Sequence, residues 1–202
     1  MNNSDYILLY IPEDKTQNVT VGLYERWRAG QRQQEIAEFV YQRLYRRYMK
    51  PFEFSDIDYR TNYKNGFSLM ANDCLLIETL ESFYRGWDKS SSSELAFLKF
   101  FTRDERFAAF STNDIPTKFY RHIRCGILHQ GETTGGWKIN RSASSPLLEI
   151  NKREINAHRF SATLKLSLGD YRDLLRASGW KSPLWESLKK KMKAILKNCE
   201  FS

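Results

Sequence analysis

The sequence predicts a mainly α-helical protein with one domain, and three observations support this prediction. Apolar residues recur at helical spacing in several segments. Proline, glycine and serine-rich stretches separate these segments. The chain has 202 residues, of which 41% are hydrophobic, enough for one domain with a core. We therefore expect a helical domain over residues 32–202, an N-terminal arm over residues 1–31 and a small β-hairpin near residues 137–155.

The first elements come before residue 60. Residues 5–11 form an apolar run that ends at Pro12, which fits a short strand or a packed arm. Residues 13–31 are polar, with a brief helix anchored by Val21, Leu23 and Trp27. Residues 33–48 carry a helical stripe that comprises Ile36, Phe39, Val40, Leu44 and Met49. The opposite face holds Arg43, Arg46 and Arg47, either as an RNA-binding surface or as a solvated basic face. Pro51 and residues 54–59 break this helix.

Residues 66–87 predict a long, strongly apolar helix at the centre of the domain. Glu78 lies among the leucines of this helix. A buried carboxylate needs a partner, and Arg124 is the candidate. The alternative is that Glu78 is exposed.

A short helix and the motif helix follow. Ser93 is the expected N-cap of a helix over residues 94–101. Residues 114–116 open the next helix, with a core stripe made of Phe119, Ile123 and Ile127. Arg124 lies beside that stripe.

The C-terminal third begins after the glycine pair at 135–136. Residues 137–140 and 147–151 predict the hairpin, which Ile155 extends. Residues 160–177 predict a helix whose inner side carries Leu164, Leu168, Tyr171, Leu174 and Leu175. The last helix starts at Ser182-Pro183 and is apolar at Leu184, Trp185, Leu188, Met192 and Leu196. Its lysines are Lys189, Lys190, Lys191, Lys193 and Lys197, which either contact RNA phosphates or are solvated.

The segment around Arg124 and His129 is the most informative for function. Arginine is a permanent planar cation that binds phosphate through two hydrogen bonds. Histidine exchanges a proton near neutral pH. Five residues advance about 500° around a straight helix, so the two side chains should point about 140° apart. We therefore expect two copies of the helix to pool these residues in a shared cleft. Gly126 would permit close approach of the second helix or a local distortion.

The string Arg124-Cys-Gly-Ile-Leu-His129-Gln-Gly-Glu-Thr, followed by a glycine pair and Trp137, resembles the Arg-x4-His motif of the HEPN superfamily (higher eukaryotes and prokaryotes nucleotide-binding). It is most similar to a bacterial branch found in plasmid and phage-defence settings. Residues 67–86 resemble the long helix that precedes the motif. The likeness covers about residues 30–200, and these two helices carry it.

This resemblance implies an antiparallel helical bundle and a metal-independent endoribonuclease that acts as a homodimer, as a toxin or a defence effector. Arg124 would hold the scissile phosphate, and His129 would act as general base or acid. Two positions depart from the family. Cys125 stands where many members have a small polar residue, and Gly131 stands where one toxin branch has a modified tyrosine. Regulation by modification at that position is therefore not expected.

Four further residues are candidates for positioning the site or binding RNA. Glu78 would orient Arg124. Arg121 would bind backbone phosphate or nothing, and His122 would lie on the helix surface. Glu132 would orient His129 or be solvated. Gly131 fits a helix C-terminus.

Composition agrees with a nucleic-acid partner. Lys and Arg exceed Asp and Glu by 32 − 24 = 8, which suits a polyanion such as RNA, although a scattered basic surface is common. No run of about 20 apolar residues indicates a membrane span. The N-terminal residues lack a signal-peptide pattern. Cys74, Cys125 and Cys199 lack metal-ligand spacing, and Cys74 fits a buried small residue. We expect a reduced cytoplasmic location and no metal or cofactor.

Three function classes remain open at this stage. The first is the ribonuclease, for which a cognate antitoxin or regulatory protein is a possible partner. The second is a non-catalytic RNA- or nucleotide-binding module. The third is an antitoxin-like or scaffold protein whose helices mediate assembly.

Overall fold

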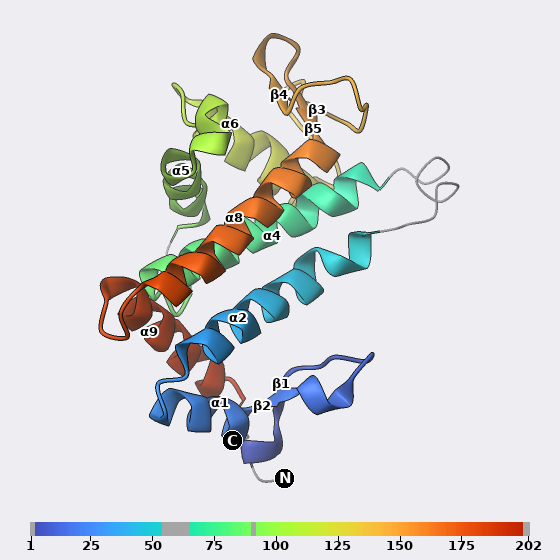
Figure 1. The fold of residues 1–202 in the computed structure, drawn as a ribbon. Helices are drawn as coiled ribbons and strands as arrows, with labels where there is room; N and C mark the ends of the chain where they lie inside the picture. The colour runs from blue at the N-terminus through green and yellow to red at the C-terminus, as the bar shows by residue number, and fades with distance from the viewer. Residues whose placement is uncertain (1–2, 54–64, 90–91, 200–202) are drawn as a thin grey trace. The chain divides into compact units, whose positions relative to one another are not determined.

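The structure, a computed structural model, describes residues 3–53, 65–89 and 92–199. The chain is mainly helical with short strands, as predicted (Figure 1). It divides into two compact units. Unit 1 comprises residues 1–46, 82–89 and 168–202, and unit 2 comprises residues 47–81 and 90–167. Residues 1–31, the expected arm, fall in unit 1 together with most of the following helix.

Unit 1 begins with two short strands and two helices. Strand β1 (Ile7–Leu9) pairs antiparallel with β2 (Val19–Thr20). Helix α1 (Val21–Ala29) follows directly, and the Thr20 side chain caps it by accepting from the Leu23 amide. Helix α2 (Gln33–Tyr48) has the predicted bounds and buries the predicted apolar stripe. The side chain of Arg43 does not lie on a solvated face, because it donates to the Leu8 carbonyl.

The rest of unit 1 comes from the ends of two long helices and from the C-terminal helix. Helix α4 (Gly66–Arg85) and helix α8 (Ala157–Ala177) contribute residues to both units. Helix α9 (Pro183–Lys197) begins at the predicted proline and is capped by Ser182. Trp185 is fully buried, and its indole Nε1 donates to the Leu175 carbonyl at 2.9 Å. Leu174, expected on the inner side of α8, is 48% exposed because it faces away from this contact.

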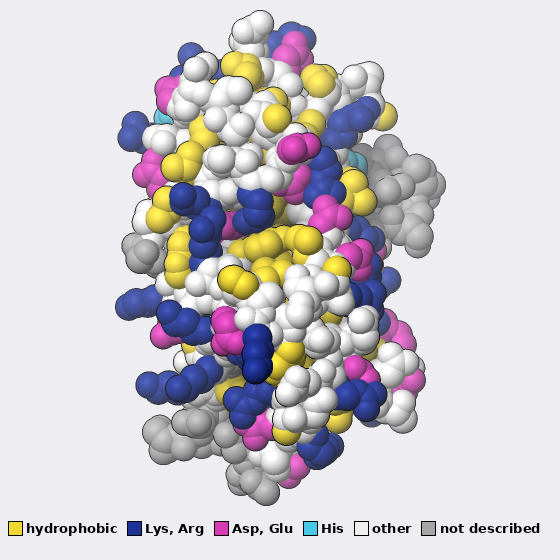
Figure 2. Space-filling model, turned by 60° about the vertical axis from the view of Figure 1, so that its left-hand side comes forward, with side chains coloured by type: hydrophobic (Ala, Val, Ile, Leu, Met, Phe, Trp, Pro, Cys, Tyr) yellow, Lys and Arg dark blue, Asp and Glu magenta, His cyan; other side chains and the backbone are white. Residues whose placement is uncertain are grey.

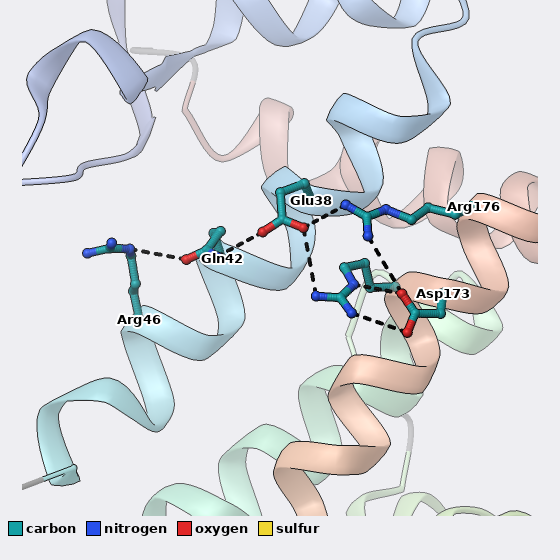
Figure 3. A network of polar contacts seen from close by, with 6 residues as sticks. Glu38, Gln42, Arg46, Asp173 and Arg176 are labelled. Atoms are coloured by element: carbon teal, nitrogen blue, oxygen red, sulfur yellow. Dashed lines mark hydrogen bonds and ion pairs between the residues drawn. The ribbon is translucent and has the colours of Figure 1, made fainter.

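Helices α2 and α8 are also joined by polar contacts within unit 1 (Figure 3). Arg176 donates to Glu38 at 2.8 Å, and Gln42 and Arg46 extend the chain of contacts along α2. Asp173 accepts from Arg172, whose guanidinium also lies 4.7 Å from the Tyr41 ring centroid. The charged side chains here are therefore largely neutralised by one another.

Unit 2 contains the motif helix. Helix α5 (Ser93–Arg103) packs on α6 (Ile115–Phe119), as Figure 1 shows. A π-helical turn (Tyr120–Arg124) and helix α7 (Cys125–Gln130) continue α6. Short 3-10 helices form at residues 50–52 and 105–110. The expected helix break at residues 54–59 lies outside the described residues.

A cluster of phenylalanine rings fixes the position of the motif helix. Phe119 is fully buried and stacks on Phe160 of α8 at 5.5 Å between centroids, with an angle of 11° between the ring planes. Adjacent aromatic contacts of this kind add to the free energy of burial. The other rings of the cluster are Phe97, Phe100, Phe101, Phe107 and Phe110. Ile123 is also fully buried, so the predicted stripe anchors one face of the motif helix.

The predicted hairpin near residues 137–155 is wrong. Strands β3 (Lys138–Asn140) and β4 (Leu148–Glu149) do not pair with each other, because β5 (Glu154–Asn156) lies between them. β5 is parallel to β3 and antiparallel to β4. The Asn156 side chain donates to the Ser142 carbonyl at 2.6 Å, which ties the long connection to the central strand.

Candidate functional site

Arg124 is the last residue of the π-helical turn. The Cys125 amide donates to the Tyr120 carbonyl five residues earlier, so one extra residue is accommodated in this turn. Such π-turns inside α-helices are frequent at functional sites. The predicted motif helix is therefore interrupted at the residue that carries the expected phosphate-binding side chain.

Glu78 holds one edge of the Arg124 guanidinium, so the predicted contact is present. Nε of Arg124 donates to Oε1 of Glu78 at 2.7 Å, and both side chains are 15% exposed. The Ser93 hydroxyl donates to Oε2 of Glu78 at 2.8 Å. Burial opposes the charge on Arg124, but the hydrogen bond and the charge of Glu78 outweigh it and raise the pKa of Arg124. The cation is thus fixed from α4.

The Ser93 contact corrects the expected N-cap of α5. Ser92 caps this helix by accepting from the Leu95 amide, and Ser93 is already its first residue. The hydroxyl of Ser93 is therefore free to support Glu78.

His129 lies against the other side of the guanidinium. Nη1 of Arg124 is 3.2 Å from Nε2 of His129. A guanidinium only donates, so Nε2 of His129 is the acceptor in this contact. The expectation that one helix cannot bring these side chains together is wrong. The 140° separation applies to points on the surface of a straight helix, whereas the long arginine side chain spans it.

Two residues that the sequence reasoning did not assign complete the surroundings of Arg124. The guanidinium carbon lies 5.7 Å from the Tyr120 ring centroid, a cation–π distance. A side-chain hydrogen bond with Cys125, and partial burial, raise the pKa of Tyr120. The phenol therefore stays protonated at neutral pH. Its position four residues before Arg124 was a signal that could have identified it.

The loop after α7 folds back on the motif helix. Gly131 has φ 72° and ends α7, as predicted. A Cβ on Gly126 would lie 2.5 Å from the Glu132 carbonyl oxygen. Gly126 thus admits this loop. The Thr134 amide donates to the His122 carbonyl at 3.0 Å.

His122 is part of this loop contact and does not lie free on the helix surface. Its Nδ1 is 2.8 Å from the Thr134 hydroxyl, and a Cβ on Gly135 would overlap its ring. Burial, followed by the charges of Arg121, Arg153 and Lys118, lowers the pKa of His122. These contacts assign His122 a packing role.

The remaining candidates are not brought to the site. Glu132 and Arg121 are exposed. Within the described residues, Glu132 makes no hydrogen bond or ion pair with His129, because its backbone and not its side chain faces the helix. The structure therefore groups Arg124, His129 and Glu78, and leaves Arg121, His122 and Glu132 apart from them.

A metal centre and a membrane-spanning helix are both absent from the described residues. No group of three or more His, Cys, Asp or Glu side chains is placed to hold a metal ion. In the same residues, none of the helices has the length and apolar character needed to cross a membrane.

Comparison of the chain with protein-family models, with curated proteins and with solved structures finds no match. The geometry of Arg124, His129 and Glu78 is therefore the basis for proposing a function.

Proposed function

We propose that the protein is a metal-independent endoribonuclease that uses Arg124 and His129. The observation that carries this proposal is the distance of 3.2 Å between the guanidinium and the imidazole, with Glu78 fixing the opposite edge of the guanidinium. A phosphate-binding cation beside a histidine, which can exchange a proton, is the combination that RNA cleavage requires. The resemblance of the Arg-x4-His string to the HEPN superfamily supports the same activity.

The chemistry follows from the donors and acceptors present. Arg124 would turn its Nη donors from His129 to a non-bridging oxygen of the scissile phosphate, while Glu78 keeps hold of Nε. This frees Nε2 of His129 to take the proton of the ribose 2′-hydroxyl. The 2′-oxygen then bonds to phosphorus, and the bond to the 5′-oxygen breaks. The leaving oxygen takes a proton, which gives a 2′,3′-cyclic phosphate and a 5′-hydroxyl end.

A homodimer would supply the second proton-transfer group. Each chain brings one His129, whereas the reaction needs a base and an acid. Two apolar side chains near the site are exposed and suit a protein contact: Leu75 on α4, 38% exposed, and Leu128 beside His129, 36% exposed. We propose that this region of unit 2 pairs with a second copy. An antitoxin or regulatory protein that covers the same region would restrain the activity.

The proposal is tested by incubating purified protein with total RNA in excess EDTA. We expect the wild type to cleave and the His129→Ala protein to be inactive. His158→Ala is the matched control, since His158 is the third histidine of the chain and lies in α8, outside the group around Arg124. Equal cleavage by the wild type and His129→Ala would reject the proposal.

A second function is favoured by one specific observation. In the structure Arg124 and His129 satisfy each other, and Glu78 occupies the remaining edge of the cation. This arrangement is also compatible with a non-catalytic RNA-binding module that is stabilised by these contacts. Binding of RNA without strand cleavage, under all conditions in which the protein is folded, would favour the module.

A further inference from the structure

A basic cavity of about 660 Å³ lies in unit 1, away in sequence from the group around Arg124. Four cationic side chains line it: Arg28 of α1 and Lys190, Lys193 and Lys197 of α9. The carboxylates of Glu25 and Asp88 also line it, so cations outnumber anions by two. Its volume falls in the range of ligand sites in proteins.

The three lysines of this cavity are not engaged by the protein. Lys190, Lys193 and Lys197 are exposed, and within the described part of the chain no hydrogen bond or ion pair holds them. Their neighbours differ, because Lys189 contacts Glu186 and the Trp180 ring, and Lys191 donates to the Asp88 carbonyl.

The spacing of these lysines suits a linear polyanion. Positions 190, 193 and 197 are three and four residues apart, which places them on one face of α9. At 1.5 Å per residue the row extends about 10.5 Å along the helix axis. A row of this length can contact more than one phosphate of a nucleic-acid strand.

The burial of α9 argues against a lipid surface as the partner. A helix that lies in a membrane interface inserts its apolar face between the lipids. The apolar face of α9 is instead used inside unit 1, where Trp185, Leu188 and Met192 are fully buried. The exposed face of α9 is mainly basic, and the cavity adds only Ala194 and Leu196 as apolar lining.

The excess of cationic side chains at the cavity is a local feature of the surface. On the face of the molecule drawn in Figure 2, Lys and Arg side chains are interspersed with Asp and Glu side chains. The net charge of +8 therefore does not by itself define a binding surface, whereas the cavity gathers three lysines of α9 beside Arg28 of α1.

We propose that this cavity binds the phosphate backbone of single-stranded RNA and holds the substrate of the ribonuclease. The choice of RNA as the polyanion rests on the proposed function. Glu25 restrains the site, because its carboxylate lies 3.8 Å from the Arg28 guanidinium and competes with phosphate for it.

The test measures binding of a short fluorescent single-stranded RNA in EDTA over a range of salt concentrations, by anisotropy, with all proteins in the His129→Ala background. The variant replaces Lys190, Lys193 and Lys197 together by Gln. The matched control replaces Lys15, Lys99 and Lys181 by Gln, since these are also exposed and the net charge falls equally. Circular dichroism checks that both variants fold.

We expect the cavity variant to lower the slope of log affinity against log salt by about 2, since each phosphate contact to a single strand contributes about 0.7. At about 0.1 M salt the affinity should fall about 100-fold. The control should change the slope by less than the value of about 0.7 that one phosphate contact contributes. Glu25→Gln should increase the affinity several-fold. An unchanged affinity in the cavity variant, or an equal loss in the control, would overturn the assignment.

Two further results separate this site from the ribonuclease activity. Loss of RNA affinity in the cavity variant, with no cleavage by any protein that carries His129, would support the site and reject the proposed activity. Cleavage that depends on His129, with unchanged RNA binding by the cavity variant, would support the proposed activity and reject the cavity as the RNA site. Vesicles of phosphatidylserine are the remaining probe. Vesicle binding that the cavity variant loses, with RNA binding intact, would overturn RNA as the partner.

Discussion

Replacing Glu78 by glutamine tests whether this carboxylate positions Arg124. The substitution keeps the shape of the side chain and removes the charge that accepts from Nε at 2.7 Å. Hydrogen bonds to charged groups contribute about 1.5–3 kcal/mol. If this free energy holds the guanidinium in place for the reaction, the cleavage rate constant falls about 10- to 150-fold, at about 1.36 kcal/mol per factor of ten.

Single-turnover cleavage of a defined RNA in EDTA gives this rate constant, and anisotropy gives the RNA affinity of the same protein. A positioning role predicts that the rate falls while the affinity changes little. Glu105→Gln is the control, because Glu105 is an exposed glutamate of unit 2. If Glu78→Gln cleaves at the wild-type rate, the reasoning that ties Glu78 to catalysis is wrong.

Three further predictions concern Arg124, Gly126 and Asp73. Arg124→Lys keeps the charge but lacks the planar fork of donors that reaches Glu78 and a phosphate from opposite edges, so cleavage should fall at least about 100-fold with unchanged thermal unfolding. Gly126→Ala places a Cβ against the Glu132 carbonyl and should lower the free energy of unfolding by about 1–3 kcal/mol, whereas Gly169→Ala, with open space around it, should raise it by about 0.5–1 kcal/mol. Burial raises the pKa of Asp73, so the folded protein binds this proton more tightly than the unfolded chain. Its stability should therefore fall as pH rises above about 4, by up to about 1.4 kcal/mol per pH unit. Urea unfolding at several pH values should show that the free energy of unfolding of Asp73→Asn lacks this fall with rising pH.

The reason for the Asp73 prediction lies in its surroundings. Asp73 is fully buried in α4, and its Oδ1 accepts from the Ser161 hydroxyl at 3.2 Å. The other oxygen, Oδ2, has no hydrogen-bond partner among the described residues. An ionised carboxylate is costly in such a place. A stability of Asp73→Asn that follows the wild type at every pH would contradict this explanation.

Helical periodicity predicted most of the fold. The bounds of α2 agree at both ends because its apolar stripe is long and regular. The short strands were harder, since β3 and β4 contain three and two residues. Such segments do not specify a partner, and sequence proximity favoured a local hairpin. The parallel pairing of β3 with β5 depends on tertiary contacts that the sequence does not display.

The candidate site was predictable in its members but not in its geometry. The need of a buried carboxylate for a cation gave the pair of Glu78 and Arg124. The π-turn was not predictable, because no residue type requires it. The contact of Arg124 with His129 in one chain was missed because the helical angle describes backbone positions and not the reach of a long side chain. The loop that packs on Gly126 was also not predicted, since a glycine shows that something approaches closely but not what does.

The most direct test of the account is the analysis of RNA ends after incubation in EDTA. A defined RNA and the same RNA with a single 2′-deoxy nucleotide at the cleavage position are treated with wild type, Arg124→Ala and His129→Ala. We predict 2′,3′-cyclic phosphate ends from the wild type alone, and no cleavage at the deoxy position. Cleavage of the deoxy substrate by the wild type, or cyclic ends produced equally by both variants, would contradict a site built from Arg124 and His129.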